Sequence, residues 1–165
     1  MVIIRLCRLA QLAAAVFRVV NLGETLCCPI CGERLEVYDT RGRMLRWGDG
    51  IWRKLIIRRL RCVGCGKLHN ELPDCVVPYK RHCADTIEKI IDGDVKDVPC
   101  DKNTTRKIRG WWGSLYVYFQ GILAAHREKF GVDCGALTLK VAARITANTH
   151  NWVFTCSGVT ARPFS

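Results

Sequence analysis

Two short motifs, CPICG at residues 28–32 and CVGCG at residues 62–66, constrain the fold of this chain more than any other feature. In each motif two residues separate the cysteines, so both sulfurs can reach one tetrahedral ion at about 2.3 Å. The glycine that follows permits positive φ, which lets backbone N–H groups point at the thiolates. We therefore predict a structural Zn²⁺ site with a closed shell of four thiolates, from Cys28, Cys31, Cys62 and Cys65.

These cysteines have two other possible roles, and a zinc site could also be catalytic. The four side chains could be unliganded and buried as small apolar groups. A redox dithiol would use a single pair at the start of a helix that follows a strand, and neither pair opens an evident helix. The histidines do not form a HExxH spacing, so an open catalytic metal site has no obvious ligands; they are His69, His82, His126 and His150.

The chain is strongly basic. Its 165 residues contain 26 Lys and Arg against 15 Asp and Glu, a formal charge of +11. Four thiolates and one Zn²⁺ would leave about +9, so the surface should still attract a polyanion. Seven of the eleven cysteines lie outside the two motifs. An odd number of scattered thiols is typical of a reducing compartment, so we predict a cytoplasmic protein in which most of these seven are buried.

The apolar N-terminus could be mistaken for a membrane segment or a signal peptide. Arg5, Arg8 and Arg18 divide its apolar residues into short pieces. A spanning helix needs about 20 predominantly apolar residues in succession, and no clean cleavage site is present. We predict that residues 1–24 form a strand and then a helix that packs on the rest of the protein, with no membrane partner.

The remaining chain predicts an α+β fold, with a zinc-ribbon β module over residues 25–78 and a helical module over residues 79–165. Turns are expected at residues 39–42 and 48–50, with a strand over residues 52–61 between the second turn and the second knuckle. Helices are expected after a capping box at residues 85–88, from about residue 101 onward, and over residues 136–147. Gly93 is a natural end for the first helix.

The basic side chains favour nucleic-acid binding, because guanidinium groups make paired hydrogen bonds to phosphate oxygens. The first two helices resemble a helix-turn-helix, whose second helix presents its N-terminal side chains to base edges. A solvated basic face remains the alternative. The predicted contacts are Arg53, Lys54, Arg58, Arg59, Arg61, Lys80, Arg81, Lys102, Arg106, Lys107 and Arg109.

The order of the motifs carries a family resemblance. A CPxCG knuckle, an Arg-rich strand ending in RRLRC, a CxxCG knuckle, then HNELP and VPYK, resembles the N-terminal zinc ribbon of bacterial transposases over residues 26–112. The likeness is closest to small bacterial proteins of mobile elements that carry this part alone. It implies DNA binding at element ends, or an accessory role beside a separate transposase.

Transposase catalysis needs an acidic triad that holds two cations, and this short chain leaves no room for that domain. We therefore predict a zinc-dependent DNA-binding protein without catalytic activity. The alternative is a protein–protein interaction adaptor, in which zinc only staples the fold and the apolar N-terminus and long helix form the partner surface. The sequence does not specify the oligomeric state.

Overall fold

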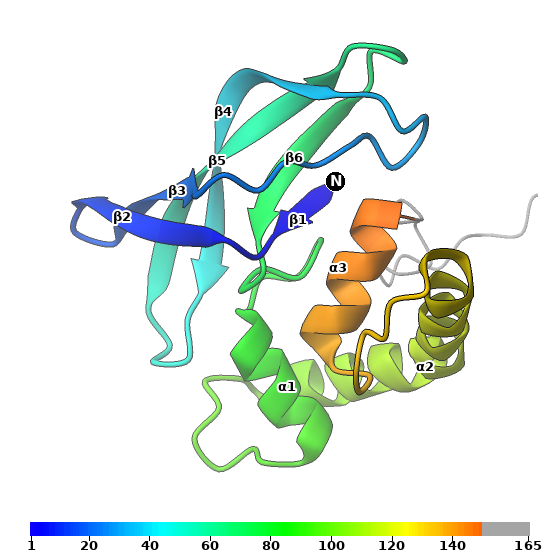
Figure 1. Cartoon of the computed structure of the whole chain (residues 1–165). Helices are drawn as coiled ribbons and strands as arrows, with labels where there is room; N and C mark the ends of the chain where they lie inside the picture. Colours follow the sequence, from blue (N-terminus) through cyan, green and yellow to red (C-terminus); the bar gives the residue numbers. More distant parts are fainter. Residues whose placement is uncertain (150–165) are drawn as a thin grey trace, which may run out of the picture.

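The computed structural model describes residues 1–149, which form a mixed sheet with helices packed on one side of it (Figure 1). The strands are β1 (Val2–Ile4), β2 (Cys7–Ala13), β3 (Val16–Asn21), β4 (Leu35–Arg46), β5 (Trp52–Cys62) and β6 (Leu68–Pro73). The helices are α1 (Ala84–Asp92), α2 (Lys102–Phe130) and α3 (Leu139–Thr149). Strands therefore fill the first half of the chain and helices the second, so the predicted α+β class is confirmed.

Strand β5 organises the sheet. Along one edge it pairs antiparallel with the whole of β4, from Leu35 opposite Cys62 to Arg46 opposite Trp52. Its other edge is shared, because β3 pairs with its first half in parallel and β6 pairs with its second half antiparallel. The strand was predicted over residues 52–61. Apolar side chains lie on both faces of this strand, and both faces are covered: Leu55 and Ile57 are fully buried and Ile56 is half-buried.

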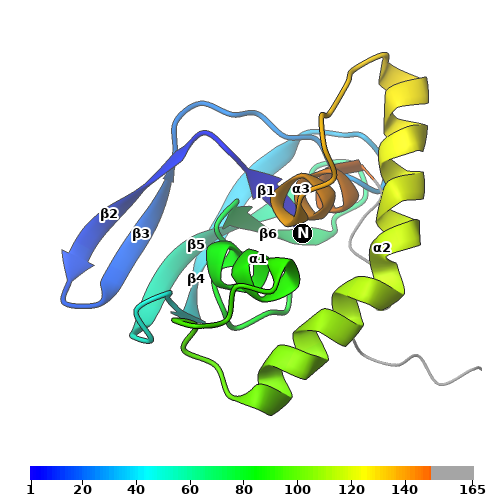
Figure 2. The ribbon, with the colours of Figure 1, turned by 90° about the horizontal axis from the view of Figure 1, so that it is seen from below.

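The core lies between the sheet and the helices. It joins Leu45 of β4 and Leu55 of β5 to Ile87 of α1, Phe119 of α2 and Ala142 of α3, all with no exposed side-chain surface. Figure 2 shows α1 and α3 against the sheet and α2 running along their outer side. Within residues 1–149 no helix is both long enough and apolar enough to cross a membrane.

The N-terminal region differs from its prediction. Residues 7–21 form the β-hairpin β2–β3 rather than a helix, with Cys7 opposite Asn21. The alanine-rich segment contains the turn, where Ala15 adopts a positive φ of 57°. A strand is favoured here because β3 finds a partner in β5, and that tertiary pairing outweighs the helix propensity of alanine.

The first strand is part of the core. β1 pairs in parallel with β6, and its three residues are at most 1% exposed. On its other side, the backbone of Ile3 exchanges two hydrogen bonds with the amide of Asn148 in α3, at 2.7 and 2.8 Å. A side-chain amide thus takes the place of a neighbouring strand, which satisfies backbone groups that would otherwise be buried and unpaired.

Two turn predictions had different outcomes. The turn at residues 48–50 is confirmed, and there Gly50 adopts φ 81° while Asp49 accepts hydrogen bonds from Ile51 and Arg53. The prediction of a turn at residues 39–42 is wrong, because these residues lie inside β4. Their turn-forming side chains are overridden by the ladder with β5, whose register shifts between Val37 and Asp39.

The helix limits follow their caps only in part. Gly93 ends α1, as predicted, and has a φ of 91°. The prediction of a capping box at residues 85–88 is wrong, because Cys83 is the N-cap of α1 and its side chain makes no capping hydrogen bond. Asp101 caps α2 and accepts a hydrogen bond from Thr104 N–H at 2.8 Å. α3 starts at Leu139, three residues later than predicted.

The later helices each bury one side. In α3 the buried residues are Leu139, Ala142, Ala143, Ile145, Thr146 and Ala147. α2 bends along its length in Figure 2. Its Gly113-Ser114 pair lies at mid-helix, where Ser114 Oγ donates to Trp111 O at 2.9 Å, a pattern that bends helices.

Candidate metal centre and basic surface

The two cysteine knuckles have the same local backbone structure. In the first, Cys28 N–H donates to Glu33 O, and Gly32 N–H donates to Cys28 O. In the second, Cys62 N–H donates to Lys67 O, and Gly66 N–H donates to Cys62 O. Each knuckle is therefore a tight loop closed by the same two hydrogen bonds, which presents both of its sulfurs on one side.

Glycines allow the knuckles to adopt this shape and to approach each other. Gly32 and Gly66 have φ of 80° and 69°, the positive values that the motif predicted. Gly64 has a different role, because a Cβ there would lie 2.7 Å from Cγ of Glu33 and 3.2 Å from its Cβ. The second knuckle can pack on the first because this position has no side chain.

The four cysteine sulfurs form one cluster. All lie within 4.8 Å of one another, with Cys28 and Cys65 at 3.7 Å and Cys31 and Cys62 at 3.3 Å. A tetrahedral ion with metal–sulfur distances of about 2.3 Å requires sulfur–sulfur separations of roughly 3.8 Å. Disulfides need about 2.05 Å, so the sulfurs are not bonded to each other. The donor set therefore fits a metal ion and could hold one.

Two cysteines of the cluster, Cys62 and Cys31, differ in how readily they lose a proton. Hydrogen bonding from the backbone N–H of Cys65 lowers the pKa of Cys62 to about 7. At Cys31 the backbone N–H of Glu33 favours the thiolate, but the hydrogen bond to Cys62 opposes it, and the pKa of Cys31 is raised to about 12. Close sulfurs thus share protons, and a divalent cation is the group that would let all four ionise together.

A histidine missed by sequence reasoning lies beside the cluster. His69 is buried, and its Nε2 is 3.4 Å from Cys28 Sγ, while Nδ1 lies 3.3 Å from the Met1 amino group. Burial lowers the pKa of His69 to about 4, and the nearby amino terminus adds to this shift. A neutral imidazole N–H in this place can donate to the thiolate and hold it in position. No signal in the sequence marks this position, because the apolar residues Leu68 and Leu72 of β6 lie on the opposite face of the strand from His69.

The other cysteines only partly follow their prediction. Cys83 is fully buried, Cys27 is exposed, and Cys7, Cys75, Cys100 and Cys134 are half-buried, while Cys156 lies outside the described residues. The prediction that most are buried is therefore wrong for the part of the chain that the structure covers. Cys27 is not in the sulfur cluster, as the two-residue spacing of Cys28 to Cys31 required.

Three arginines predicted to bind nucleic acid have partners inside the protein. Arg58 makes two hydrogen bonds of 2.6 Å to Glu71, whose side chain is 2% exposed. Arg59 pairs through two nitrogens with Asp39 in the neighbouring strand. Arg53 does the same with Asp49 in the turn. These guanidinium groups hold β4, β5 and β6 together.

The other predicted cations divide by location. On the sheet and the loop before α1, Lys54, Arg61 and Arg81 are exposed. Lys80 is half-buried, with its ammonium 3.9 Å from the centre of the Trp111 ring, and burial lowers its pKa to about 8. At the start of α2, the exposed cations are Lys102, Arg106, Lys107 and Arg109.

The cations of α2 lie at the end of a helix that disfavours them. Lys102, Arg106 and Arg109 are spaced by four and three residues and therefore share one face. The first turn contains no acidic side chain. Arg109 Nε donates to Ile90 O near the end of α1, at 2.9 Å. The nine residues 93–101 that connect the two helices are longer than a helix-turn-helix connection, so the helix-turn-helix stays a prediction.

The comparisons with known proteins bear on the same region. Residues 28–108 match a family model described as a domain of unknown function, DUF6431. The matched segment begins at the first cysteine of the cluster and contains both knuckles, β4 to β6, α1 and the first two turns of α2. No match was found among curated proteins or among solved structures.

Proposed function

We propose that this protein binds DNA and that Zn²⁺ in the four-sulfur site holds the binding fold together. Zinc is the metal that best suits the site, because closed tetrahedral sites made of four cysteines are typical of structural zinc. The ion would join two segments that are 30 residues apart and would fix the end of β5 against the first knuckle. The role of the metal is therefore architectural.

One observation carries the DNA-binding proposal: the cationic face at the start of α2. Positive charge in the first turn of a helix is unfavourable by about 0.3–1 kcal/mol, and Lys102 lies in that turn. Within residues 1–149, the three cations of this face, Lys102, Arg106 and Arg109, make no ion pair with a carboxylate that would offset their charge. A phosphate would provide that compensation, and the resulting contacts would position the helix on a duplex.

We propose a binding role rather than catalysis. The carboxylates of Asp39, Asp49 and Glu71 are held by arginines, and such pairs are poorly suited to coordinate the cations of phosphoryl transfer. The association with mobile elements, and with a transposase as partner, is supported by the resemblance of the knuckle, strand and knuckle order alone.

The test combines metal analysis with a salt series. Purified protein should contain about one zinc per chain, and duplex DNA affinity should fall steeply with salt, because bound phosphates release counterions. Replacing Lys102 with Ala should lower the slope of log K against log salt by about one, the value for one lost phosphate contact. Lys129→Ala is the matched control, since Lys129 is an exposed lysine at the far end of the same helix. Equal effects of the two variants, or salt-independent binding, would refute the proposal.

A second candidate function is an adaptor for another protein. The last buried residue of α2 is Phe119, and the following eleven residues are all exposed or half-buried in the described structure. Val117 and Phe130 are 77% and 49% exposed. These apolar side chains favour a protein contact along the second half of the helix. The replacement Val117→Asp should abolish such a contact and leave DNA binding unchanged.

A further inference from the structure

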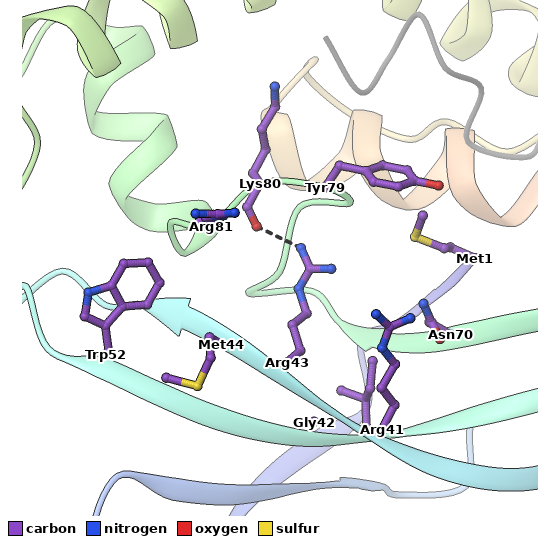
Figure 3. Close-up of a pocket in the computed structure, with 11 residues that line it drawn as sticks. Met1, Arg41, Gly42, Arg43, Met44, Trp52, Asn70, Tyr79, Lys80 and Arg81 are labelled. Carbon is purple, nitrogen blue, oxygen red and sulfur yellow. Dashed lines mark hydrogen bonds between the residues drawn. The ribbon is translucent and has the colours of Figure 1, made fainter. Parts of the chain in front are cut away.

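A cavity on the helix-facing side of the sheet concentrates positive charge away from the start of α2. It has a volume of about 620 Å³ and opens between β4, β5 and the loop at residues 76–83. Figure 3 shows Arg41, Arg43 and Arg81 around it, with Trp52 and Tyr79 at its rim. None of its described lining residues is acidic. The volume falls within the roughly 300–1,000 Å³ of small-molecule sites.

The arginines of this cavity differ from those of the neighbouring strand. Arg41 and Arg43 lie opposite Ile57 and Leu55 in the β4–β5 ladder, so both project from the face of the sheet that carries the core. In β5, Arg53, Arg58 and Arg59 each have a carboxylate partner. Arg41 and Arg43 make no ion pair anywhere in the described part of the chain, so the cavity has uncompensated positive charge.

Arg43 is the most constrained of these groups. Its Nη2 donates to the carbonyl oxygens of Val77 and Lys80, at 3.2 and 2.8 Å, which fixes the loop at the cavity wall. Its Nε is buried and has no hydrogen-bond partner within residues 1–149. Burial and the charge of Arg41 lower the pKa of Arg43, as expected for a guanidinium that lacks an anion. Because the partners of this guanidinium are neutral carbonyl groups, its positive charge would be neutralised by an anion in the cavity.

Aromatic side chains give the cavity a second chemistry. Trp52 and Tyr79 are 44% and 53% exposed, and both line the cavity. Tyr79 adopts φ 61°, a strained value for a residue with a side chain, so its backbone conformation is imposed by the loop. Exposed aromatic rings next to arginines are the arrangement on which nucleic-acid bases stack while their phosphates are neutralised. The ammonium of Lys80, another residue of the cavity lining, lies over the Trp111 ring.

We propose that this cavity binds a nucleotide unit, with its phosphate at Arg41, Arg43 and Arg81 and its base against Trp52 or Tyr79. The same chemistry is present in a free mononucleotide and at the phosphorylated end of a DNA strand. The site is distinct from the cationic face of α2, so it extends the proposed function without depending on it.

The test is calorimetric titration of the metal-loaded full chain with thymidine 5′-monophosphate, with thymidine, and with a 5′-phosphorylated oligothymidine. The nucleotide should bind at least tenfold more tightly than the nucleoside, because the nucleoside lacks the phosphate. Arg41→Ala should weaken nucleotide binding at least tenfold, and Trp52→Leu should weaken it severalfold. Arg18→Ala removes an exposed arginine of β3 as the matched control and should change the affinity less than twofold. Arg43 is left intact because it anchors the loop.

The outcomes separate the sources and the two proposals. If the oligonucleotide binds more tightly than the mononucleotide and loses affinity equally in Arg41→Ala, the ligand is a strand end; equal affinities identify a free nucleotide. Equal binding of nucleoside and nucleotide, or equal losses in Arg41→Ala and Arg18→Ala, would overturn the cavity proposal. Nucleotide binding in a protein that ignores duplex DNA would refute only the DNA proposal, whereas the reverse result would refute only this one.

Discussion

The ion pair between Arg58 and Glu71 provides a sharp test of how the sheet is held together. Glu71 is 2% exposed and accepts two hydrogen bonds of 2.6 Å from Arg58 and one of 3.0 Å from Asn21. Arg58→Met would leave a buried carboxylate with the Asn21 amide as its one remaining side-chain donor in the described structure. Breaking a buried pair in this way costs about 3–5 kcal/mol.

The expected magnitude follows from the exposure of the two partners. Because the Arg58 side chain is 33% exposed, water can reach the orphaned carboxylate and the loss should be at the lower limit, about 3 kcal/mol. Glu71→Gln keeps an acceptor for Arg58 and should cost about 1.5 kcal/mol. The double variant has no unpaired buried charge, so it should cost less than the sum, with a coupling energy of about 2 kcal/mol.

Urea denaturation of the metal-loaded protein measures these values. With m of about 1–3 kcal/mol per molar urea, Arg58→Met should lower the midpoint by roughly 1–3 M. Arg34→Met is the control, because the Arg34–Glu36 pair is 69% and 55% exposed and should contribute less than about 1 kcal/mol. If Arg58→Met costs no more than Arg34→Met, or if the single effects simply add, the ion pair does not support the sheet as argued.

Three further substitutions test local packing and hydrogen bonding. Gly64→Ala places a Cβ 2.7 Å from a Glu33 carbon, so zinc affinity measured by competition with a chelator should fall at least tenfold; unchanged affinity would show that the knuckles need no close approach. Gly110→Ala is its counterpart, since nothing lies within 4 Å of a Cβ there, and the unfolding free energy should rise by about 0.5–1 kcal/mol. Asn148→Ala removes both hydrogen bonds to Ile3 and should cost about 2 kcal/mol in thermal unfolding, whereas a neutral result would mean that water replaces the amide.

The sequence was most informative where local chemistry determines structure. The sulfur cluster follows from the spacing of cysteine and glycine within two five-residue motifs, and each motif forms its loop with hydrogen bonds of its own. The Asp101 and Gly93 caps were predictable for the same reason, because a cap acts on one turn of helix.

The errors arose where distant pairing determines structure. Residues 7–21 are apolar and alanine-rich, a composition that fits a helix until β5 offers β3 an edge. Residues 39–42 look like a turn but continue β4 because eleven residue pairs tie that strand to β5. The cavity was missed although Arg41 and Arg43 alternate in the sequence, since their significance depends on which arginines the folded chain leaves without carboxylates.

The position of the cysteine cluster has a consequence for the order of events during folding. Cys62 ends β5, and in the antiparallel ladder it lies opposite Leu35, just beyond the first knuckle. A slip of the ladder by one residue would turn every β5 side chain to the opposite face and carry the Cys62 sulfur away from the other three. An ion that requires all four sulfurs would therefore be retained only by chains that had aligned these strands correctly, so metal capture would act as a proofreading step for the sheet.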